Sequence, residues 1–418
     1  MLLHDGEIGA PQPPLDEETG LLTRAAFLER LASEVASGGG QGDAIGLVIV
    51  DLDWFADTAR RLGRADAGAL LRGVAGRLRG VPGIALAGRF DDDEFAFLIR
   101  SHPAALAAAA AVACVREPFR RGTAAIELTA SAGSAHFPAD ALSPTGLLRR
   151  AEVALFYAKN SGRDRAVAYE RAMRTELAAK VRTSVGQGNF ALQYQPIAAL
   201  QPPGGLLGLE ALMRWRHPER GVLQPGAFHA LFENPEVAML VGQTALDQAL
   251  GEAGRWLRCG IGFGALSLNV SAAQLRHPDF VEQAASLIVR HAVPPRCVRL
   301  DLPAVVAGDQ DPAETAAAIG AIREIGVGIA FPRPALLCGL YAGLPRPGDW
   351  LKATMPAAPD LVALLAGARA GGLTLVLERV ERPDQLARAR MAGADGAQGF
   401  AYSRPLAPED IAAFASGA

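Results

Sequence analysis

The sequence predicts an α/β protein with two folded parts, an α+β domain followed by a (β/α)8 barrel. First, strand-like and helix-like segments alternate from Asp16 onward in the 418-residue chain. Second, a charged helical segment without glycine or proline, residues 169–185, separates a shorter series of segments from a longer one. Third, the longer series holds eight strand-like runs within about 220 residues, which is the number and spacing of a (β/α)8 barrel.

The first domain is expected at residues 16–168, after a proline-containing tail of residues 1–15. Its first strand is a near-continuous apolar run that ends in Asp51 and Asp53, a pattern typical of a buried strand with a functional carboxyl end. The expected elements are, in order, a helix after Thr23, a strand at 45–53, a helix after Asp66, a hairpin of 84–90 and 94–99, a helix at 104–115, a strand at 126–135 and a helix at 147–160.

The second domain is expected at residues 186–418, after a connecting helix at 169–185. Its strand-like runs are 190–197, 206–215, 265–270, 298–302, 327–331, 350–354, 373–378 and 396–400. Polar residues stand at or near the ends of these runs, and in a (β/α)8 barrel such residues converge on the face that carries the active site. These residues are Gln195, Glu210, Asn269, Asp301, Lys352, Glu378 and Gln398.

The composition narrows the class of protein. Half of the residues are apolar and 20% are charged, so an extended disordered chain is excluded. A net charge of −3 argues against a nucleic-acid-binding surface. The four cysteines are scattered, which favours a reducing, cytoplasmic location, and we expect no signal peptide. The longest apolar run, residues 104–115, is too short to span a membrane.

Sequence motifs connect both halves to known families. The second half carries EALMRWRHPERG at 210–221, LNVS at 268–271, LERVE at 377–381 and QGFAYSRPL at 398–406, and it resembles EAL-type cyclic di-GMP phosphodiesterases. The first half carries ETGLLTRAAF at 18–27, VDLDWF at 50–55, RFDDDEF at 89–95 and AEVALFYAKNSGRDR at 151–165, and it resembles GGDEF-type diguanylate cyclases. The resemblance implies a GGDEF domain at 16–168 and an EAL domain at 186–418.

In the GGDEF-like half, the resemblance places metal ligands at Asp51 and Asp93. It places phosphate contacts at Lys159 and Arg163, and it makes Asp93 and Glu94 remnants of the catalytic turn. These positions retain residues of the expected type.

Other positions of the same half depart from the family. Asp91 and Asp92 replace the two glycines of the turn, where the backbone must approach phosphate closely. The two residues that would contact guanine fall on Ala59 and Gly68, which carry no polar side chain. We therefore expect no diguanylate cyclase activity.

In the EAL-like half, the resemblance places metal ligands at Glu210, Asn269, Asp301 and Glu378, and ligand contacts at Gln195, Arg214, Lys352 and Gln398. Lys352 and Glu378 are then remnants of the catalytic machinery. The acid pair that bridges two metal ions is replaced by Pro332 and Arg333, and a supporting acid is replaced by Ala304. Since neither Pro332 nor Arg333 can ligate a cation, two-metal hydrolysis is expected to be lost. We expect no required cofactor, and Mg²⁺ or Mn²⁺ only as residual binding.

Three functions fit these departures. The first is a catalytically inactive receptor that binds cyclic di-GMP in the barrel, with Arg333 as a built-in counter-ion for the acids and no need for metal. The second is a protein-interaction scaffold that binds no nucleotide and uses the rewritten loop at 332–348. The third is a weak residual phosphodiesterase. A protein partner is expected in the first two cases, and a homodimer is compatible with all three.

Overall fold

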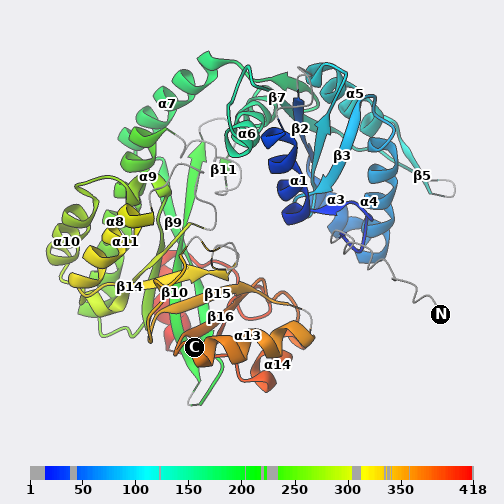
Figure 1. Cartoon of the computed structure of the whole chain (residues 1–418). Helices are drawn as coiled ribbons and strands as arrows, with labels where there is room; N and C mark the ends of the chain where they lie inside the picture. The colour runs from blue at the N-terminus through cyan, green and yellow to red at the C-terminus, as the bar shows by residue number, and fades with distance from the viewer. Residues whose placement is uncertain are drawn as a thin grey trace, which may run out of the picture. The chain divides into compact units, whose positions relative to one another are not determined.

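The computed structural model describes residues 15–37, 45–121, 124–202, 204–217, 221–223, 234–303, 312–333, 336, 339, 341–356 and 358–416. The expected tail before residue 15 lies outside these residues. The chain divides into two compact units, Met1–Glu176 and Leu177–Ala418, and the boundary falls within helix α7 (Arg171–Gly186) (Figure 1). Within the described parts of the chain, no helix combines the length and apolar character needed to cross a membrane.

The first unit is an α+β domain around a six-stranded sheet of order β1-β3-β4-β2-β7-β8. The apolar strand β2 lies inside the sheet, antiparallel to β4 and β7. The elements are β1 (Leu22–Thr23), α1 (Arg24–Ala36), β2 (Ile45–Leu52), α3 (Phe55–Leu62), α4 (Arg64–Leu78), β3 (Ile84–Arg89), β4 (Glu94–Ile99), α5 (Ala104–Arg116), β5 (Phe119–Arg121), β6 (Ala124–Ile126), β7 (Ala130–Phe137), α6 (Pro144–Asn160) and β8 (Ala166–Ala168).

Local sequence explains most of these boundaries. The Thr23 side chain accepts a hydrogen bond from the Ala26 amide and so caps α1, as expected. The sequence did not predict helix α3. Gly63, with a φ of 80°, separates α3 from α4, so α4 begins at Arg64, two residues before Asp66. The strand expected at 126–135 is divided between β6, which pairs with β5 in a separate ribbon, and β7 in the main sheet.

The second unit is a barrel in which eight strands close in the order β9-β10-β12-β13-β14-β15-β16-β17-β9. Strand β11 extends β10 as a hairpin outside this ring. The elements after α7 are β9 (Phe190–Ala199), β10 (Gly205–His217), β11 (Gly221–Leu223), α8 (Pro235–Arg258), β12 (Ala265–Asn269), α9 (Ala272–Leu275), α10 (Phe280–Arg290), β13 (Val298–Asp301), α11 (Pro312–Glu324), β14 (Gly328–Pro332), β15 (Trp350–Thr354), α13 (Ala358–Ala370), β16 (Thr374–Glu378), α14 (Pro383–Ala392), β17 (Gly396–Ala397) and α15 (Ile411–Ala415).

The first barrel strand runs in the opposite direction to the expected one. Strand β9 is antiparallel to both β10 and β17, because a short turn rather than a helix joins β9 to β10. The expectation that all polar residues stand at carboxyl strand ends therefore needs correction. Gln195 lies in the middle of β9, directly opposite Glu210, which itself lies within the long β10. Register rather than strand termination brings these two side chains to the site.

Helix α6 lies so close to strand β7 that a side chain at Gly133 would meet the backbone of the helix. A Cβ atom added to Gly133 would stand 2.1 Å from the Leu155 amide nitrogen and 2.2 Å from the Ala151 carbonyl oxygen. No side chain can occupy this position unless α6 moves away from the sheet. Gly133 thus fixes the distance between the helix and the sheet that carry Lys159 and Asp51.

We predict that Gly133→Ala lowers the free energy of unfolding of the first unit by about 3 kcal/mol, because the added methyl group overpacks the interface. The control is Gly76→Ala in α4, where an added Cβ meets nothing within 4 Å. There the change should stabilise the protein by up to about 1 kcal/mol, because alanine restricts the unfolded chain. Urea unfolding followed by circular dichroism measures both effects, and equal stability of the two variants would contradict the prediction.

Candidate functional site

The interior of the barrel holds a buried lysine surrounded by carboxylates. Lys352 lies in the middle of β15, and only 6% of its side chain is exposed. Its Nζ lies 2.5 Å from Asp301 Oδ2, 3.0 Å from Glu378 Oε1 and 3.2 Å from Glu210 Oε2. Nζ donates hydrogen bonds to Asp301 and Glu210, and Glu378 is an ion-pair partner.

Hydrogen bonds from neighbouring strands orient the carboxylates. Asn269 Nδ2 donates to Glu210 Oε1 at 2.7 Å, and Gln398 Nε2 donates to Glu210 Oε2 at 2.7 Å. Ser267 Oγ donates to the Asp301 oxygen that Lys352 does not contact. The parallel register places Glu210 level with Ser267 and Asn269 level with Asp301. Strand register is therefore the reason that these side chains meet.

Burial and charge act in opposite directions on the cluster. Burial opposes ionisation of Glu210, but the attraction of Lys352 and two hydrogen bonds outweigh it and hold the pKa of Glu210 below its usual value. Burial likewise disfavours the charged form of Lys352, yet the three carboxylates raise its pKa well above the usual value. At Asp301 burial prevails and raises the pKa, although Lys352 opposes the shift. The ammonium therefore stays charged across the physiological pH range.

The strand beside Lys352 ends without an acidic residue. Pro332 is the last residue of β14 and pairs in register with Lys352, and half-buried Arg333 follows it. These are the positions at which the resemblance requires the acid pair that bridges two metal ions. Within the part of the chain that the structure describes, no group of three or more His, Cys, Asp or Glu residues is arranged to hold a metal ion. The described residues at these strand ends do not fit a two-metal site. Ala304 lies outside the described residues.

The counter-ion of the acids is Lys352, where the sequence suggested Arg333. Among the described residues, Arg333 forms no ion pair with any carboxylate of the cluster, whereas Lys352 contacts all three. Lys352 starts from a strand position inside the barrel, so its four-carbon stem reaches the acids. Arg333 follows the last residue of β14 and so stands beyond that level. The lysine assigned to a ligand phosphate thus serves the protein's own carboxylates.

Two groups of the expected ligand site retain hydrogen-bonding capacity. Arg214 donates through Nε to Gln193 Oε1 at 2.8 Å and through Nη1 to a backbone carbonyl, while its Nη2 has no hydrogen-bond partner among the described residues. Gln398 Oε1 is buried and also lacks a partner there. Gln195 uses both ends of its amide, accepting from Gln398 at 3.1 Å and donating to the Ser403 carbonyl at 3.2 Å.

In the first unit, a group of half-buried acids lies at the end of β2. Asp51 pairs in register with Glu94, and Lys159 of α6 stands 2.5 Å from Asp51 Oδ2. Burial and then repulsion from Asp51 raise the pKa of Asp93 to about 7. Burial and then the charge of Glu152 raise the pKa of Glu94 to about 8. Near neutral pH, Glu94 and in part Asp93 hold protons that ordinary carboxyl groups have lost.

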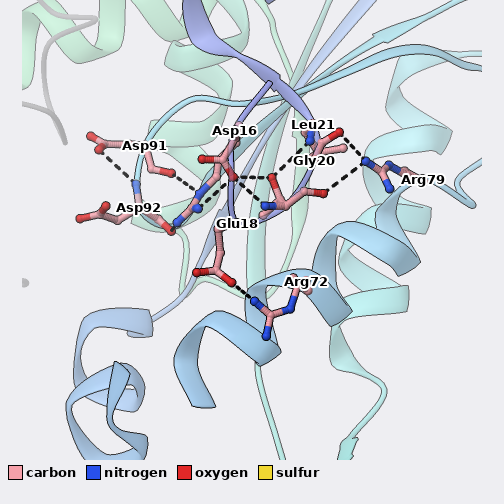
Figure 2. A network of polar contacts seen from close by, with 10 residues as sticks. Asp16, Glu18, Gly20, Leu21, Arg72, Arg79, Asp91 and Asp92 are labelled. Atoms are coloured by element: carbon pink, nitrogen blue, oxygen red, sulfur yellow. Dashed lines mark hydrogen bonds and ion pairs between the residues drawn. The ribbon is translucent and has the colours of Figure 1, made fainter. Parts of the chain in front are cut away.

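Arg89 organises the acidic turn between β3 and β4, of which Figure 2 labels Asp91 and Asp92. Its Nε and Nη2 donate to the carbonyl oxygens of Asp91 and Asp92 at 3.2 and 2.8 Å, and its Nη1 donates to Asp16 Oδ1 at 3.1 Å. Asp91 and Asp92 are exposed, and their carboxylates point away from Asp16 in Figure 2. The turn therefore presents two negative charges where the resemblance requires glycine.

Ala59 and Gly68, the two positions expected to contact guanine, do not offer space or polar groups for a guanine base. Ala59 packs against the hydrophobic core of the first unit. A Cβ on Gly68 would lie 2.7 Å from Glu18 Oε1, and Arg72 holds the Glu18 carboxylate in an ion pair (Figure 2). The space beside Gly68 is thus filled by an acid from the start of the domain.

Arg163, the second residue expected to contact phosphate, also contacts other residues of the protein. The Arg163 guanidinium lies 4.0 Å from the centre of the exposed Trp54 ring, and its Nε lies 3.8 Å from Asp53 Oδ1. Asp53 is buried and accepts hydrogen bonds from Thr129 and Ser131 at 2.9 and 2.8 Å. A negatively charged ligand would have to compete with these contacts.

Comparison with known proteins agrees with both halves of this description. Residues 14–165 match the family of the diguanylate cyclase GGDEF domain, and residues 178–331 match the EAL domain family. The chain is a tandem GGDEF–EAL protein. Its family is that of the cyclic di-GMP signalling proteins.

A relative from Pseudomonas aeruginosa, the bifunctional diguanylate cyclase/cyclic di-GMP phosphodiesterase MucR, is 27% identical over 95% of this chain and 61% of its own. The PaMucR phosphodiesterase, solved as a c-di-GMP complex, is 27% identical with a TM-score of 0.50, over 56% of this chain and 99% of its own. The Vibrio cholerae LapD S helix-GGDEF-EAL structure bound to c-di-GMP shares the fold, with 17% identity and a TM-score of 0.50 over 92% of this chain and 95% of its own. The chain spans about half the length of the curated relatives it matches.

Some contributors to the two GGDEF–EAL sites were not identified from the sequence. Ser267 stands two residues before Asn269 on β12, so strand periodicity placed both on one face and was a usable signal. Gln193 and Gln195 on β9 share a face for the same reason. For Glu18 no comparable signal exists, because its approach to Gly68 joins segments 50 residues apart.

We predict that the GGDEF unit loses stability as the pH rises from 5 to 9 in EDTA-containing buffer. The pKa of Glu94 lies at about 8 in the folded unit, against a usual value of 4.5. Between pH 4.5 and about pH 8, the folded unit keeps the Glu94 proton that the unfolded chain has released. The contribution of this proton to the free energy of unfolding is therefore complete below pH 4.5 and decreases as the pH rises toward 8. The loss should reach about 3 kcal/mol.

Urea unfolding at several pH values measures how the free energy of unfolding changes with pH. Glu94→Gln should make this pH dependence shallower, and Asp93, with a pKa of about 7, still contributes to it. The exposed acid Glu29 of α1 provides the control Glu29→Gln, which should leave the pH dependence unchanged. A wild-type stability that rises with pH over this range would contradict the prediction.

Proposed function

We propose that this GGDEF–EAL protein is a receptor that binds cyclic di-GMP through its barrel and neither makes nor cleaves it. The observation that carries the proposal is the register of β14 and β15, in which Pro332 stands beside Lys352. Two-metal hydrolysis needs acids at this point to hold the metal ions on either side of the scissile phosphate. The proline side chain offers no ligand atom, and the next residue, Arg333, carries a positive charge.

Binding without cleavage is supported by the donors and acceptors that remain. Arg214 Nη2 has no partner among the described residues and is suited to a phosphate oxygen. Gln398 Oε1 is a buried acceptor without a partner there, and a ligand N–H group or a water molecule would satisfy it. The related PaMucR phosphodiesterase was solved as a c-di-GMP complex, so a barrel of this family accommodates the dinucleotide.

The absence of synthesis is supported by the charges of the first unit. Asp91 and Asp92 are exposed at the turn, where a triphosphate would meet two additional negative charges. Lys159, the expected phosphate contact, stands 2.5 Å from Asp51 instead. Synthesis would require these charges to be rearranged.

A scaffold without nucleotide binding is the second candidate, and one observation favours it. Lys352 is ion-paired with three carboxylates of the protein itself, and these compete with a phosphate for its ammonium group. Part of the loop at 332–348, the expected partner surface, lies outside the described residues. A binding experiment separates the scaffold from the receptor.

We predict that cyclic di-GMP binds the full chain equally well in EDTA and in Mg²⁺, as measured by isothermal titration calorimetry. Arg214→Ala should weaken binding at least about tenfold, because a charged hydrogen bond to phosphate is lost. Arg216 on the same strand is exposed, and Arg216→Ala serves as the matched control with unchanged affinity. Loss of affinity on chelation, or full affinity in Arg214→Ala, would contradict this mode of binding. No binding in either buffer would favour the scaffold.

We predict no turnover by either half. With Mg²⁺ or Mn²⁺, cyclic di-GMP should remain intact because no acid stands at Pro332, and GTP should remain intact because of the acidic turn. Chromatographic product analysis over many hours measures both. Accumulation of linear pGpG that disappears in Glu210→Gln would establish a residual phosphodiesterase. Synthesis of cyclic di-GMP that disappears in Asp93→Ala would establish a cyclase.

A further inference from the structure

Arg214 carries a buried charge that no acid of the described chain neutralises. The residue is 7% exposed, and its guanidinium donates to Gln193 Oε1 at 2.8 Å and to the Met213 carbonyl oxygen at 2.9 Å. Both acceptors are neutral, and among the described residues Arg214 forms no ion pair with a carboxylate. The other basic residues that the resemblance assigns to phosphate each contact an acid, and they are Lys159, Arg163 and Lys352.

We propose that Gln193 is a positioning residue that holds Arg214 without neutralising it and so reserves the charge of Arg214 for a phosphate group. The identity of that phosphate as part of cyclic di-GMP rests on the proposed function. The role of Gln193 itself follows from strand register, hydrogen-bond direction and burial.

Strand register places Gln193 beside the guanidinium. In the antiparallel pairing of β9 and β10, Gln193 stands opposite Leu212. The small residue Ala191 stands opposite Arg214, so Gln193 and Arg214 are diagonal neighbours, within reach of a long side chain. Glu210 precedes Arg214 by four residues on the same strand and shares its face, so the pair belongs to the inner wall of the barrel.

The direction of the hydrogen bond fixes the orientation of both side chains. A guanidinium has only N–H donors, so the amide oxygen of Gln193 faces it and the NH₂ group turns the other way. Nε donates to Gln193 and Nη1 to Met213, which leaves Nη2 without a hydrogen-bond partner among the described residues. Two bonds at two different nitrogens hold the guanidinium plane in place, and a group held in this way loses less conformational entropy when a ligand binds.

Burial makes the charge of Arg214 unfavourable unless an anion compensates it. Loss of water around the guanidinium lowers the pKa of Arg214, and the charge of Glu210 opposes this shift. A carboxylate at position 193 would form an ion pair and offset the cost of burial, as Asp51 does for Lys159 at 2.5 Å. The neutral amide of Gln193 leaves the positive charge to be compensated by an anionic ligand.

The test changes the charge of the acceptor while keeping its size. Gln193→Glu retains an oxygen beside Arg214 and adds a negative charge, whereas Gln193→Leu removes the acceptor. Gln243 of α8 is exposed, and Gln243→Glu provides the control with the same change of net charge. Each substitution is made in the full-length wild type and in Arg214→Ala. Thermal unfolding is recorded without ligand, and binding of cyclic di-GMP is measured by isothermal titration calorimetry.

Without ligand, Gln193→Glu should raise the unfolding temperature of the wild type by about 3 °C, because the buried guanidinium gains a counter-charge. The same substitution should weaken cyclic di-GMP binding at least about tenfold, because Arg214 is then neutralised. A residue with a purely structural role would change stability and affinity in the same direction. Gln193→Leu should lower both, Gln243→Glu should change neither, and both effects of Gln193→Glu should disappear in Arg214→Ala.

The ligand-free comparison decides the role of Gln193 separately from the proposed function. An unfolding temperature that is unchanged or lower in Gln193→Glu, or a rise that persists in Arg214→Ala, would overturn the inference. Equal affinity of the wild type and Gln193→Glu for cyclic di-GMP would also overturn it.

If the wild type binds no cyclic di-GMP, the proposed function fails, and inorganic phosphate serves as the probe. Stabilisation of the wild type but not of Gln193→Glu by phosphate would then support the reserved charge of Arg214, and equal stabilisation of the two proteins would overturn it.

Discussion

A single buried ammonium makes the acidic interior of the EAL barrel compatible with folding. Lys352 stands on β15, and its three carboxylate partners come from β10, β13 and β16. The interaction therefore joins four strands that are distant in sequence, and it exists only when the barrel is closed. Glu210 and Asp301 are also held by donors from neighbouring strands, whereas the contact given for Glu378 is the ion pair with Lys352.

The GGDEF half follows the same physical rule with different residues. Lys159 serves Asp51, Arg163 lies against Trp54 and near Asp53, and Arg89 serves the backbone of the acidic turn. Lys159, Arg163 and Lys352, which the family resemblance assigns to phosphate, each contact an acid of the protein itself. A ligand would be recognised by groups with capacity left over, of which Arg214 in the barrel is the clearest case.

The folds and the activities of the two domains depend on different residues. The barrel closes and the sheet forms because apolar strands such as β2 and β14 bury their side chains, a requirement that the substitutions at Pro332 and Asp91 do not disturb. Activity depends instead on a few acids and glycines at strand ends and turns. A tandem GGDEF–EAL chain can therefore keep both folds while its sites diverge.

The sequence by itself determined the two folds, their order and most of the residues that meet in the barrel. Apolar runs of strand length with polar residues near their ends are local properties, so Asn269, Asp301 and Glu378 were placed from the sequence alone. Tertiary structure alone decided the direction of β9, the approach of Glu18 to Gly68 and the choice of Lys352 over Arg333 as counter-ion. These features depend on strand register and on which side chains come within reach of one another. Both are determined only when segments far apart in the sequence pair.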